Sequence, residues 1–309
     1  MEVLAEIVRS GFVEGHHRGA VVRVDPGGDA VWSVGDPDMV IFPRSSNKPL
    51  QALGMLRAGL PLDGRLLALS SASHSGEPFH IEGVREILAR AGLDESALQT
   101  PPSYPLDPHT YAEYLRSNGD RAPIYMDCSG KHAAMLLTCV TNGWPTDTYL
   151  SPEHPVQQAI DETFADMTGA TPSAVGTDGC GAPLLATSLS RLARAFGAII
   201  QAPEGSPERR LAAAMVASPE YVSGTTRDEM FLMKAFPGAI AKSGAESVYV
   251  LAMPDGNAFA LKIDDGADRA RPVVMAKALT LAGYQHPLLL EEPVILGGGK
   301  PVGTIRATF

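Results

Sequence analysis

Two serine–lysine segments that lie far apart in the chain carry the residue types that acyl-transfer chemistry needs. Ser45 precedes Lys48 by three residues, and at the start of a helix this spacing puts hydroxyl and amine on one face. A serine hydroxyl is a poor nucleophile near neutral pH, but a neighbouring amine with a lowered pKa can accept its proton. The second segment is Lys242-Ser243-Gly244. Together they predict a serine nucleophile that is activated by lysine.

A serine-rich stretch, residues 69–77, offers a second hydroxyl. Its four serines within six residues are Ser70, Ser71, Ser73 and Ser75. One interpretation is a polar turn that caps the helix expected to begin near Pro78. The other places Ser73 or Ser75 in the site as a proton relay partnered by Lys242.

Two glycine-rich turns carry cysteines: Cys128 lies within residues 127–132, and Cys180 within residues 177–183. Both turns are expected to lead into apolar helices. Two thiolates with a histidine or a carboxylate could hold zinc, although the paired C-x-x-C spacing of structural zinc fingers is missing. The alternative is two small buried cysteines at helix starts. Cys139 lies in an apolar run and is assigned to the core.

These residues need a fold that brings distant parts of the chain to one site, and the strand patterns predict it. Residues 20–24 and 30–34 flank a turn, and residues 247–252 and 258–263 repeat this hairpin pattern. We therefore predict an α/β (α+β) fold in which one antiparallel sheet is built from both chain ends and carries a helical insertion.

The whole chain, residues 1–309, is predicted to form a single domain. Its sheet part comprises about residues 1–43 and 238–309, and its helical part about residues 44–237. In this arrangement Ser45 begins the insertion and Lys242 lies where the chain re-enters the sheet. Both residues are therefore expected to face the cleft between the two parts.

Apolar residues at helical spacing predict the helices of the insertion and one near the C-terminus. The predicted helices cover residues 48–58, about 78–91, 156–168, 183–196, 208–217 and 274–282. Residues 99–110 contain four prolines and are predicted to form an irregular loop.

Composition excludes several other classes of protein. A net charge of −10 without a dense basic patch argues against nucleic-acid or anionic-membrane partners. The N-terminus lacks signal-peptide character, and no apolar run of 18 residues could span a bilayer. Three cysteines are too few for a disulfide framework. We expect a soluble, cytoplasmic enzyme.

Five motifs together support a more specific interpretation. In chain order they are Arg44-Ser45-x-x-Lys48-Pro49, Ser73-His74-Ser75-Gly76-Glu77, Cys128-Ser129-Gly130-Lys131-His132, Asp178-Gly179-Cys180-Gly181 and Ala241-Lys242-Ser243-Gly244-Ala245-Glu246. In this combination the chain resembles the Rhizobium etli-type (class 3) L-asparaginases. The resemblance implies a fold similar to serine β-lactamases and glutaminases, two Ser–Lys pairs, and a zinc site of two cysteines and a lysine.

The resemblance also assigns catalytic roles to residues of this chain. Ser45 matches the nucleophile and Lys48 its partner. Ser73 matches the second serine and Lys242 the second lysine, with Ser75 close enough to be the alternative. Two close lysines are expected to lower each other's pKa, which would make one of them a neutral base.

The remaining matches concern metal and substrate. Zinc ligands implied by the resemblance are Cys128, Lys131 and Cys180, while His132 stays an alternative third ligand. Candidate substrate-binding residues are Arg44, Asp178 and Ser75, with Asp178 expected either to bind the amino group or to order a water next to the metal ligands. A polar loop around Arg227 lies either near the cleft or in a surface turn.

The implied activity is hydrolysis of L-asparagine to L-aspartate and ammonia in a homodimer, with zinc positioning the substrate. A glutaminase or another β-lactamase-like acyl-serine amidohydrolase remains an alternative. So do a zinc-dependent amidohydrolase whose serines are structural, and a non-catalytic amino-acid-binding protein. Because asparagine and glutamine differ by one methylene, their discrimination depends on the length of the pocket.

Overall fold

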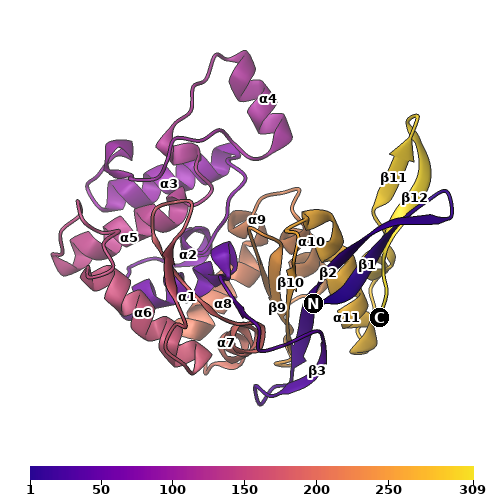
Figure 1. Ribbon diagram of the computed structural model, residues 1–309. Coiled ribbons are helices and arrows are strands. Elements are labelled where there is room, and N and C mark those ends of the chain that lie inside the picture. Colours follow the sequence, from indigo (N-terminus) through magenta and orange to yellow (C-terminus); the bar gives the residue numbers. More distant parts are fainter.

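The computed structural model describes residues 1–309 and contains one large antiparallel sheet flanked by helices (Figure 1). In spatial order its strands are β11 (Val294–Gly297), β12 (Lys300–Ala307), β1 (Glu2–Arg9), β2 (Phe12–Val24), β10 (Ala258–Ile263), β9 (Val248–Ala252) and β8 (Ile240–Gly244), and β3 (Ala30–Val34) pairs with β2. The predicted sheet built from both chain ends is confirmed. The two predicted hairpins are β2–β3 and β9–β10.

Strand β2 runs through both halves of the sheet. Its first half pairs with β1, and its second half pairs with β10 and β3. Gly19 lies where the partner changes, and a Cβ there would collide with the carbonyl oxygen of Lys262 in β10. A residue without a side chain is therefore needed at this position for β10 to approach β2.

Both faces of the central strands are covered, because α7 (Leu189–Gln201) and α11 (Arg271–Leu281) pack on opposite sides. Gly197 of α7 lies close to Ala258 of β10, whereas the ring of the next residue, Phe259, contacts Tyr284 just after α11. Successive side chains of a strand point to opposite faces. Strands β8 and β9 are accordingly buried along their whole length.

The helical region connects β3 to β8. Its other helices are α1 (Lys48–Arg57), α2 (Gly64–Ser70), α3 (Pro78–Arg90), α4 (Pro108–Arg116), α5 (Ser129–Asn142), α6 (Pro155–Thr168), α8 (Pro207–Ala217), α9 (Pro219–Val222) and α10 (Asp228–Ala235). Two small sheets pair β4 (Val40–Ile41) with β7 (Thr187–Ser188) and β5 (Val175–Thr177) with β6 (Pro183–Leu185).

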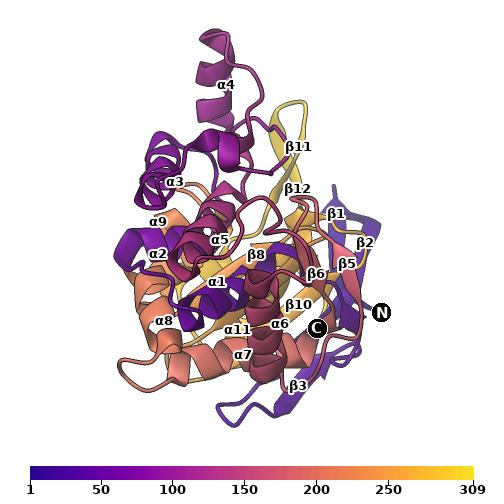
Figure 2. The same cartoon turned by 90° about the vertical axis from the view of Figure 1, so that its left-hand side faces the viewer.

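Helix α1 lies at the centre of this region, in contact with α2, α5, α6 and α8 (Figure 2). Gly54 of α1 lies so close to α6 that a Cβ would be 2.8 Å from the Cα of Ile160. Of its ten residues, all except Arg57 are buried. Lys48, the first residue of this enclosed helix, is consequently shielded from water.

Most predicted helices are confirmed close to their expected bounds, but the helix predicted over residues 183–196 is wrong in its first part. There the chain forms β6 and β7, which pair with β5 and β4, and α7 begins only at Leu189. Pairing with another strand, nearby for β6 and distant for β7, outweighs local helical periodicity. The predicted loop over residues 99–110 also ends early, because the Asp107 side chain caps α4, which begins at Pro108.

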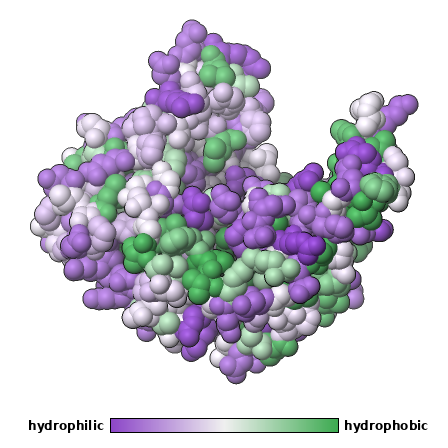
Figure 3. Space-filling view, viewed as in Figure 1, coloured by the Kyte–Doolittle hydropathy of each residue, from purple (hydrophilic) through white to green (hydrophobic).

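Two elements project from the body of the molecule. Figure 3 shows α4 and the β11–β12 hairpin rising on either side of a hollow in the surface. None of the helices is both long enough and apolar enough to cross a membrane.

Candidate active site

The 3₁₀ turn η1 (Arg44–Asn47) presents Ser45 at the N-terminal end of α1. Arg44 has a φ of 52°, a left-handed conformation that is unusual for a residue with a side chain. Gly244 of β8 lies against this turn, since a Cβ there would be 2.5 Å from the Pro43 carbonyl oxygen and 3.2 Å from the Ser45 nitrogen. The glycine of Lys242-Ser243-Gly244 thus lets the strand approach the serine turn.

A pocket of about 230 Å³ opens at this contact. It is lined by Arg44, Ser45, Ser73, Leu106, Met126, Asp127, Cys128, Asp178, Gly179, Cys180, Arg227, Ser243, Gly244, Ala245, Asp268 and Arg271. Three serines, three arginines and three aspartates are among these residues. Such a lining suits a small ligand that carries charges of both signs.

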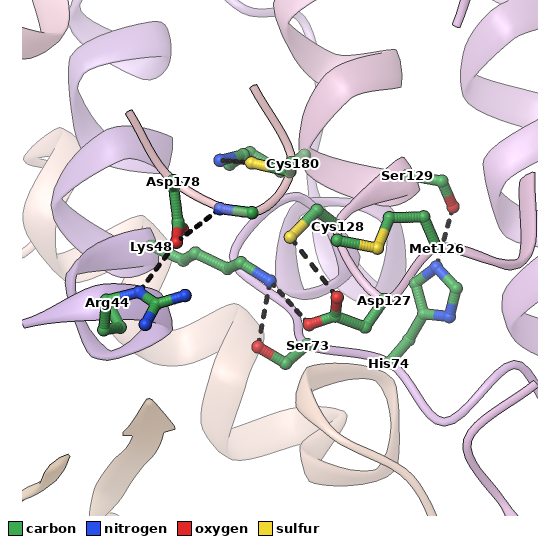
Figure 4. Close-up of polar contacts among 12 residues, drawn as sticks. Arg44, Lys48, Ser73, His74, Met126, Asp127, Cys128, Ser129, Asp178 and Cys180 are labelled. Atoms are coloured by element: carbon green, nitrogen blue, oxygen red, sulfur yellow. Dashed lines mark hydrogen bonds and ion pairs between the residues drawn. The ribbon is translucent and has the colours of Figure 1, made fainter. Parts of the chain in front are cut away.

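Lys48 is fully buried. Its Nζ donates a hydrogen bond to Ser73 Oγ at 2.9 Å and lies 3.2 Å from Asp127 Oδ2 (Figure 4). No hydrogen bond joins Ser45 to Lys48. The amine that the motif places beside the first serine is therefore bonded to the second serine.

The positive charge of Lys48 is stabilised in its buried position. Burial alone would lower its pKa, but the Asp127 carboxylate and the sulfurs of Cys128 and Cys180 together outweigh burial, so that the pKa is raised. Burial would raise the pKa of Asp127, yet Lys48 holds it at about 2. The expectation that the two lysines lower each other's pKa is therefore wrong for Lys48, because its carboxylate partner is so close.

Lys242 of β8 is also fully buried, but its surroundings differ. Its Nζ donates to the carbonyl oxygen of Ser243 at 2.9 Å and lies 3.7 Å from Glu229 Oε1. Burial lowers its pKa to about 7; Glu229 opposes this change, and the charge of Lys48 adds to it. Lys242 makes no hydrogen bond to Ser73. It is the amine of this site that can lose its proton near neutral pH.

Glu229 is a site residue that the sequence analysis missed. It is completely buried, and Ser243 donates both its hydroxyl and its backbone N–H to Glu229 Oε1. Lys242 holds its pKa well below the usual range, although burial acts in the opposite direction. No pattern points to it, because an acidic residue in the first turn of a helix is common.

Asp127 is the second residue that was missed, although it begins the Cys128 turn that drew attention in the sequence. The site role of a carboxylate at this position depends on the distance to Lys48, a residue 79 positions earlier in the chain. Only the tertiary structure supplies that distance.

Ser73 and Ser75 differ clearly in position. Ser73 lines the pocket, whereas Ser75 is buried outside the lining and donates to the Ser223 carbonyl oxygen at 2.8 Å. Between them, His74 lies 2.7 Å from Ser129 Oγ and accepts a hydrogen bond from the Gly76 N–H. These contacts place Ser73 at the pocket and give Ser75 a structural bond instead.

Arg44 and Asp178 form an ion pair at the pocket wall, with Arg44 Nε 2.8 Å from Asp178 Oδ1. The same oxygen accepts the Gly179 N–H at 2.9 Å. The turn between β5 and β6 carries Asp178, so the pairing of these two strands, of which β6 had been predicted as helix, brings this carboxylate to the site.

Cys128, Lys131 and Cys180 come together next to the pocket, all of them buried. Lys131 Nζ donates to Cys180 Sγ at 3.4 Å (Figure 4 shows Cys128 and Cys180). The neighbouring Cys128 thiol, followed by the charge of Lys131, lowers the pKa of Cys180 despite burial. Two sulfurs and an amine at one point are a donor set that fits zinc.

No group of three His, Cys, Asp or Glu side chains is arranged to hold a metal ion. Lys131, whose Nζ contacts Cys180 Sγ, is therefore the candidate third ligand for the two thiolates. His132 stands beside it, and its Nδ1 is bonded to the Tyr149 hydroxyl at 2.8 Å. Its buried Nε2 has no hydrogen-bond partner, and burial lowers its pKa, so this ring is neutral.

A small charged pocket with serine hydroxyls at its wall and lysine amines beneath it is typical of hydrolases that act through a serine. The comparison with protein families agrees. Residues 5–307 match the family model described as L-asparaginase II. The chain belongs to this family and is an amidohydrolase acting on a small-molecule substrate.

Structural likenesses are more distant. A β-lactamase from Mycobacterium bovis is 13% identical, with 86% of this chain and 95% of that chain covered and a TM-score of 0.48. A D-stereospecific amidohydrolase from a Streptomyces species is also 13% identical, with 86% and 94% covered and a TM-score of 0.41. Simvastatin synthase from Aspergillus terreus is 12% identical, with 80% of this chain and 86% of that chain covered and a TM-score of 0.42. Among curated proteins none matches this chain.

Proposed function

We propose that this enzyme hydrolyses the side-chain amide of L-asparagine, with Ser45 as the nucleophile. The observation that supports this proposal is the pocket itself, where Ser45 and Ser73 share a charged wall with Lys48 and Lys242 buried behind it. Its volume of about 230 Å³ suits a substrate of amino-acid size.

The opposite pKa shifts of the two lysines favour a division of work between them. Ser45 Oγ attacks the amide carbon and passes its proton to the neutral amine of Lys242. The C–N bond breaks, and the nitrogen leaves as ammonia after it receives a proton from the Ser73 hydroxyl. Lys48 then donates its own proton to the Ser73 oxygen. The Ser45 N–H at the helix start would stabilise the oxyanion.

Hydrolysis of the acyl-serine reverses these transfers. Water attacks the ester and gives its proton through Ser73 to Lys48. Lys242 returns its proton to the Ser45 oxygen as aspartate leaves, so that both lysines regain their first states. All four residues that the sequence singled out as catalytic take part, but with Ser73 bonded to Lys48 in place of Lys242.

A zinc ion held by Cys128, Cys180 and Lys131 is part of the proposal. Zinc at this place would act as a Lewis acid that binds and orients the polar end of the substrate. The buried position and the lowered pKa of Cys180 support the assignment. Elemental analysis of purified protein should find one zinc per chain, lost in Cys128→Ser and kept in the control Cys139→Ser. Zinc-free wild type would contradict it.

The direct test of the activity is ammonia release from L-asparagine and L-glutamine. Wild type should release ammonia from asparagine, and Ser45→Ala should reduce turnover by at least about 10³-fold, because the acyl-serine cannot form. Ser117→Ala, a change at an exposed serine of the α4 segment, is the matched control and should leave turnover unchanged. Full activity in Ser45→Ala would rule out the mechanism.

A further inference from the structure

Three guanidinium groups line the pocket, and two of them already have close carboxylate partners. Arg44 is paired with Asp178 at 2.8 Å. Arg271 makes two hydrogen bonds of 2.9 Å to Asp228 and lies 3.0 Å from Asp268. Neither group can bind an anionic ligand at full strength without giving up a partner.

Arg227 is the exception. Its side chain is 29% exposed, and its guanidinium makes no hydrogen bond. Glu229 is the one carboxylate near it, with Oε2 3.7 Å from Arg227 Nε, beyond hydrogen-bond distance. The other Glu229 oxygen is occupied by Ser243. The N–H groups of Arg227 are thus available at the pocket wall.

The segment that carries Arg227 is fixed relative to the catalytic loop. Thr225 donates its N–H and its hydroxyl to the Glu77 carboxylate at 3.0 and 2.6 Å. Gly224, with a φ of 142°, lies directly against Ser75, where no side chain could fit. These contacts tie residues 224–227 to the loop of Ser73, so the free guanidinium is held at a defined place beside the second serine.

We propose that Arg227 binds the α-carboxylate of the amino-acid substrate. A guanidinium matches a carboxylate with two parallel hydrogen bonds, and partial burial strengthens them. The α-carboxylate is the group that separates asparagine from simple amides, and no other guanidinium of the pocket is free to receive it. This inference rests on the proposed asparaginase function. It adds the residue by which the enzyme would prefer an amino-acid amide to an amide without an α-carboxylate.

A purely structural role for Arg227 would be to neutralise Glu229 and thereby to hold Lys242 and Ser243. The two roles differ in what they do to a substrate without an α-carboxylate. 3-Aminopropanamide is asparagine with the carboxylate replaced by hydrogen, and it keeps the same reacting amide. Damage to Glu229 or Lys242 slows both substrates equally, whereas loss of a carboxylate contact slows asparagine alone.

The experiment measures kcat/KM for ammonia release from both amides with wild type, Arg227→Gln and Arg227→Lys. Arg227→Gln should reduce kcat/KM for asparagine by about 10- to 100-fold, mostly through KM, as expected for a charge-assisted hydrogen bond. The value for 3-aminopropanamide should stay within about threefold. The kcat/KM of Arg227→Lys for asparagine should lie between those of wild type and Arg227→Gln. Lysine keeps the positive charge but cannot donate two parallel hydrogen bonds to a carboxylate. Arg18→Gln, at an exposed arginine of β2, is the control.

Two results would overturn the inference: an equal loss for both amides, or no loss for either one in Arg227→Gln. If turnover of 3-aminopropanamide is too slow to follow, the constant for its inhibition of asparagine hydrolysis is measured in place of kcat/KM. This inhibition constant should differ by less than about threefold between wild type and Arg227→Gln. Wild type that releases no ammonia from asparagine would instead reject the proposed function, and the inference with it. Thermal melts confirm that each variant is folded.

Discussion

Lys48 and Lys242 are both completely buried, yet burial has opposite net outcomes for their charges. Lys48 has Asp127 Oδ2 at 3.2 Å and the Ser73 hydroxyl at 2.9 Å, and its pKa is raised. Lys242 has its nearest carboxylate, Glu229, at 3.7 Å, and its pKa falls to about 7. Burial alone therefore does not make a lysine a base; the charged groups around the amine decide.

The difference explains how one pocket can hold an acid and a base with the same side chain. In the proposed mechanism, Lys48, which is charged in the resting enzyme, delivers a proton through Ser73, while Lys242, which titrates near neutral pH, removes one from Ser45. Enzymes that separate the pKa values of two like groups in this way assign acid and base by environment. Four changes would break or sharpen the comparison.

The largest effect is expected from matched Lys→Arg changes. Arg keeps the positive charge but cannot be deprotonated, so Lys242→Arg should lower kcat for asparagine by about 10² to 10⁴-fold. Lys48→Arg should also lower kcat, because Arg cannot release the proton that Ser73 passes on, but its remaining rate should keep the rise with pH that Lys242 causes. Steady-state kinetics from pH 6 to pH 9, with near-UV circular dichroism to verify folding, measure both. A folded Lys48→Arg that loses this rise, with a Lys242→Arg that keeps it, would reverse the assignment of acid and base.

A second comparison separates the two serines of the same loop. Ser73→Ala should lower kcat by about 10²-fold, because the proton from Lys48 then lacks its relay. Ser75→Ala removes only a hydrogen bond to the Ser223 carbonyl and should stay within about threefold of wild type in kcat. Equal losses in the two variants would show that the loop matters for its shape and not for the Ser73 hydroxyl.

Removing the carboxylate partner of Lys48 should affect stability more than chemistry. Asp127→Asn leaves a buried ammonium without its counter-charge, and we expect the free energy of unfolding to fall by about 3 kcal/mol. Urea denaturation at pH 7 measures it. Asp161→Asn, at an exposed aspartate of α6, is the matched control and should change the free energy of unfolding by less than about 0.5 kcal/mol. A variant as stable as wild type would mean that solvent already screens the Lys48–Asp127 pair.

The smallest expected effect is on the pH profile. Because the proposed base is the neutral form of Lys242, kcat should rise with pH through about 7. Glu229 raises that pKa, so Glu229→Gln should shift the rise by roughly one unit toward lower pH. The groups that surround this amine are Glu229, Lys48, Arg227 and Asp127. A shift toward higher pH in Glu229→Gln would show that another group controls the rise.

The sequence was sufficient for the parts of this site that lie in local motifs. Ser45, Lys48 and Lys242 could be chosen because their neighbours in the chain carry the signal, and the hairpin patterns at both ends predicted the sheet. Contacts between residues that are distant in the sequence could not be predicted. Which lysine bonds Ser73 depends on the position of Asp127, and the Asp178 turn was missed as a strand connection because β5 and β6 are only three residues long each.

The pairing of β1 with β12, in which Ala5 lies opposite Ala307, has a consequence for synthesis of the protein. The ribosome makes these two strands about three hundred residues apart, so β1 must wait for its neighbour until residues 300–307 have emerged. During that interval, one edge of β1 is open to pairing with other chains. A circular permutant that joins residues 1 and 309 and opens the Gly298-Gly299 turn would make this strand pair local, and it should refold faster than the natural order.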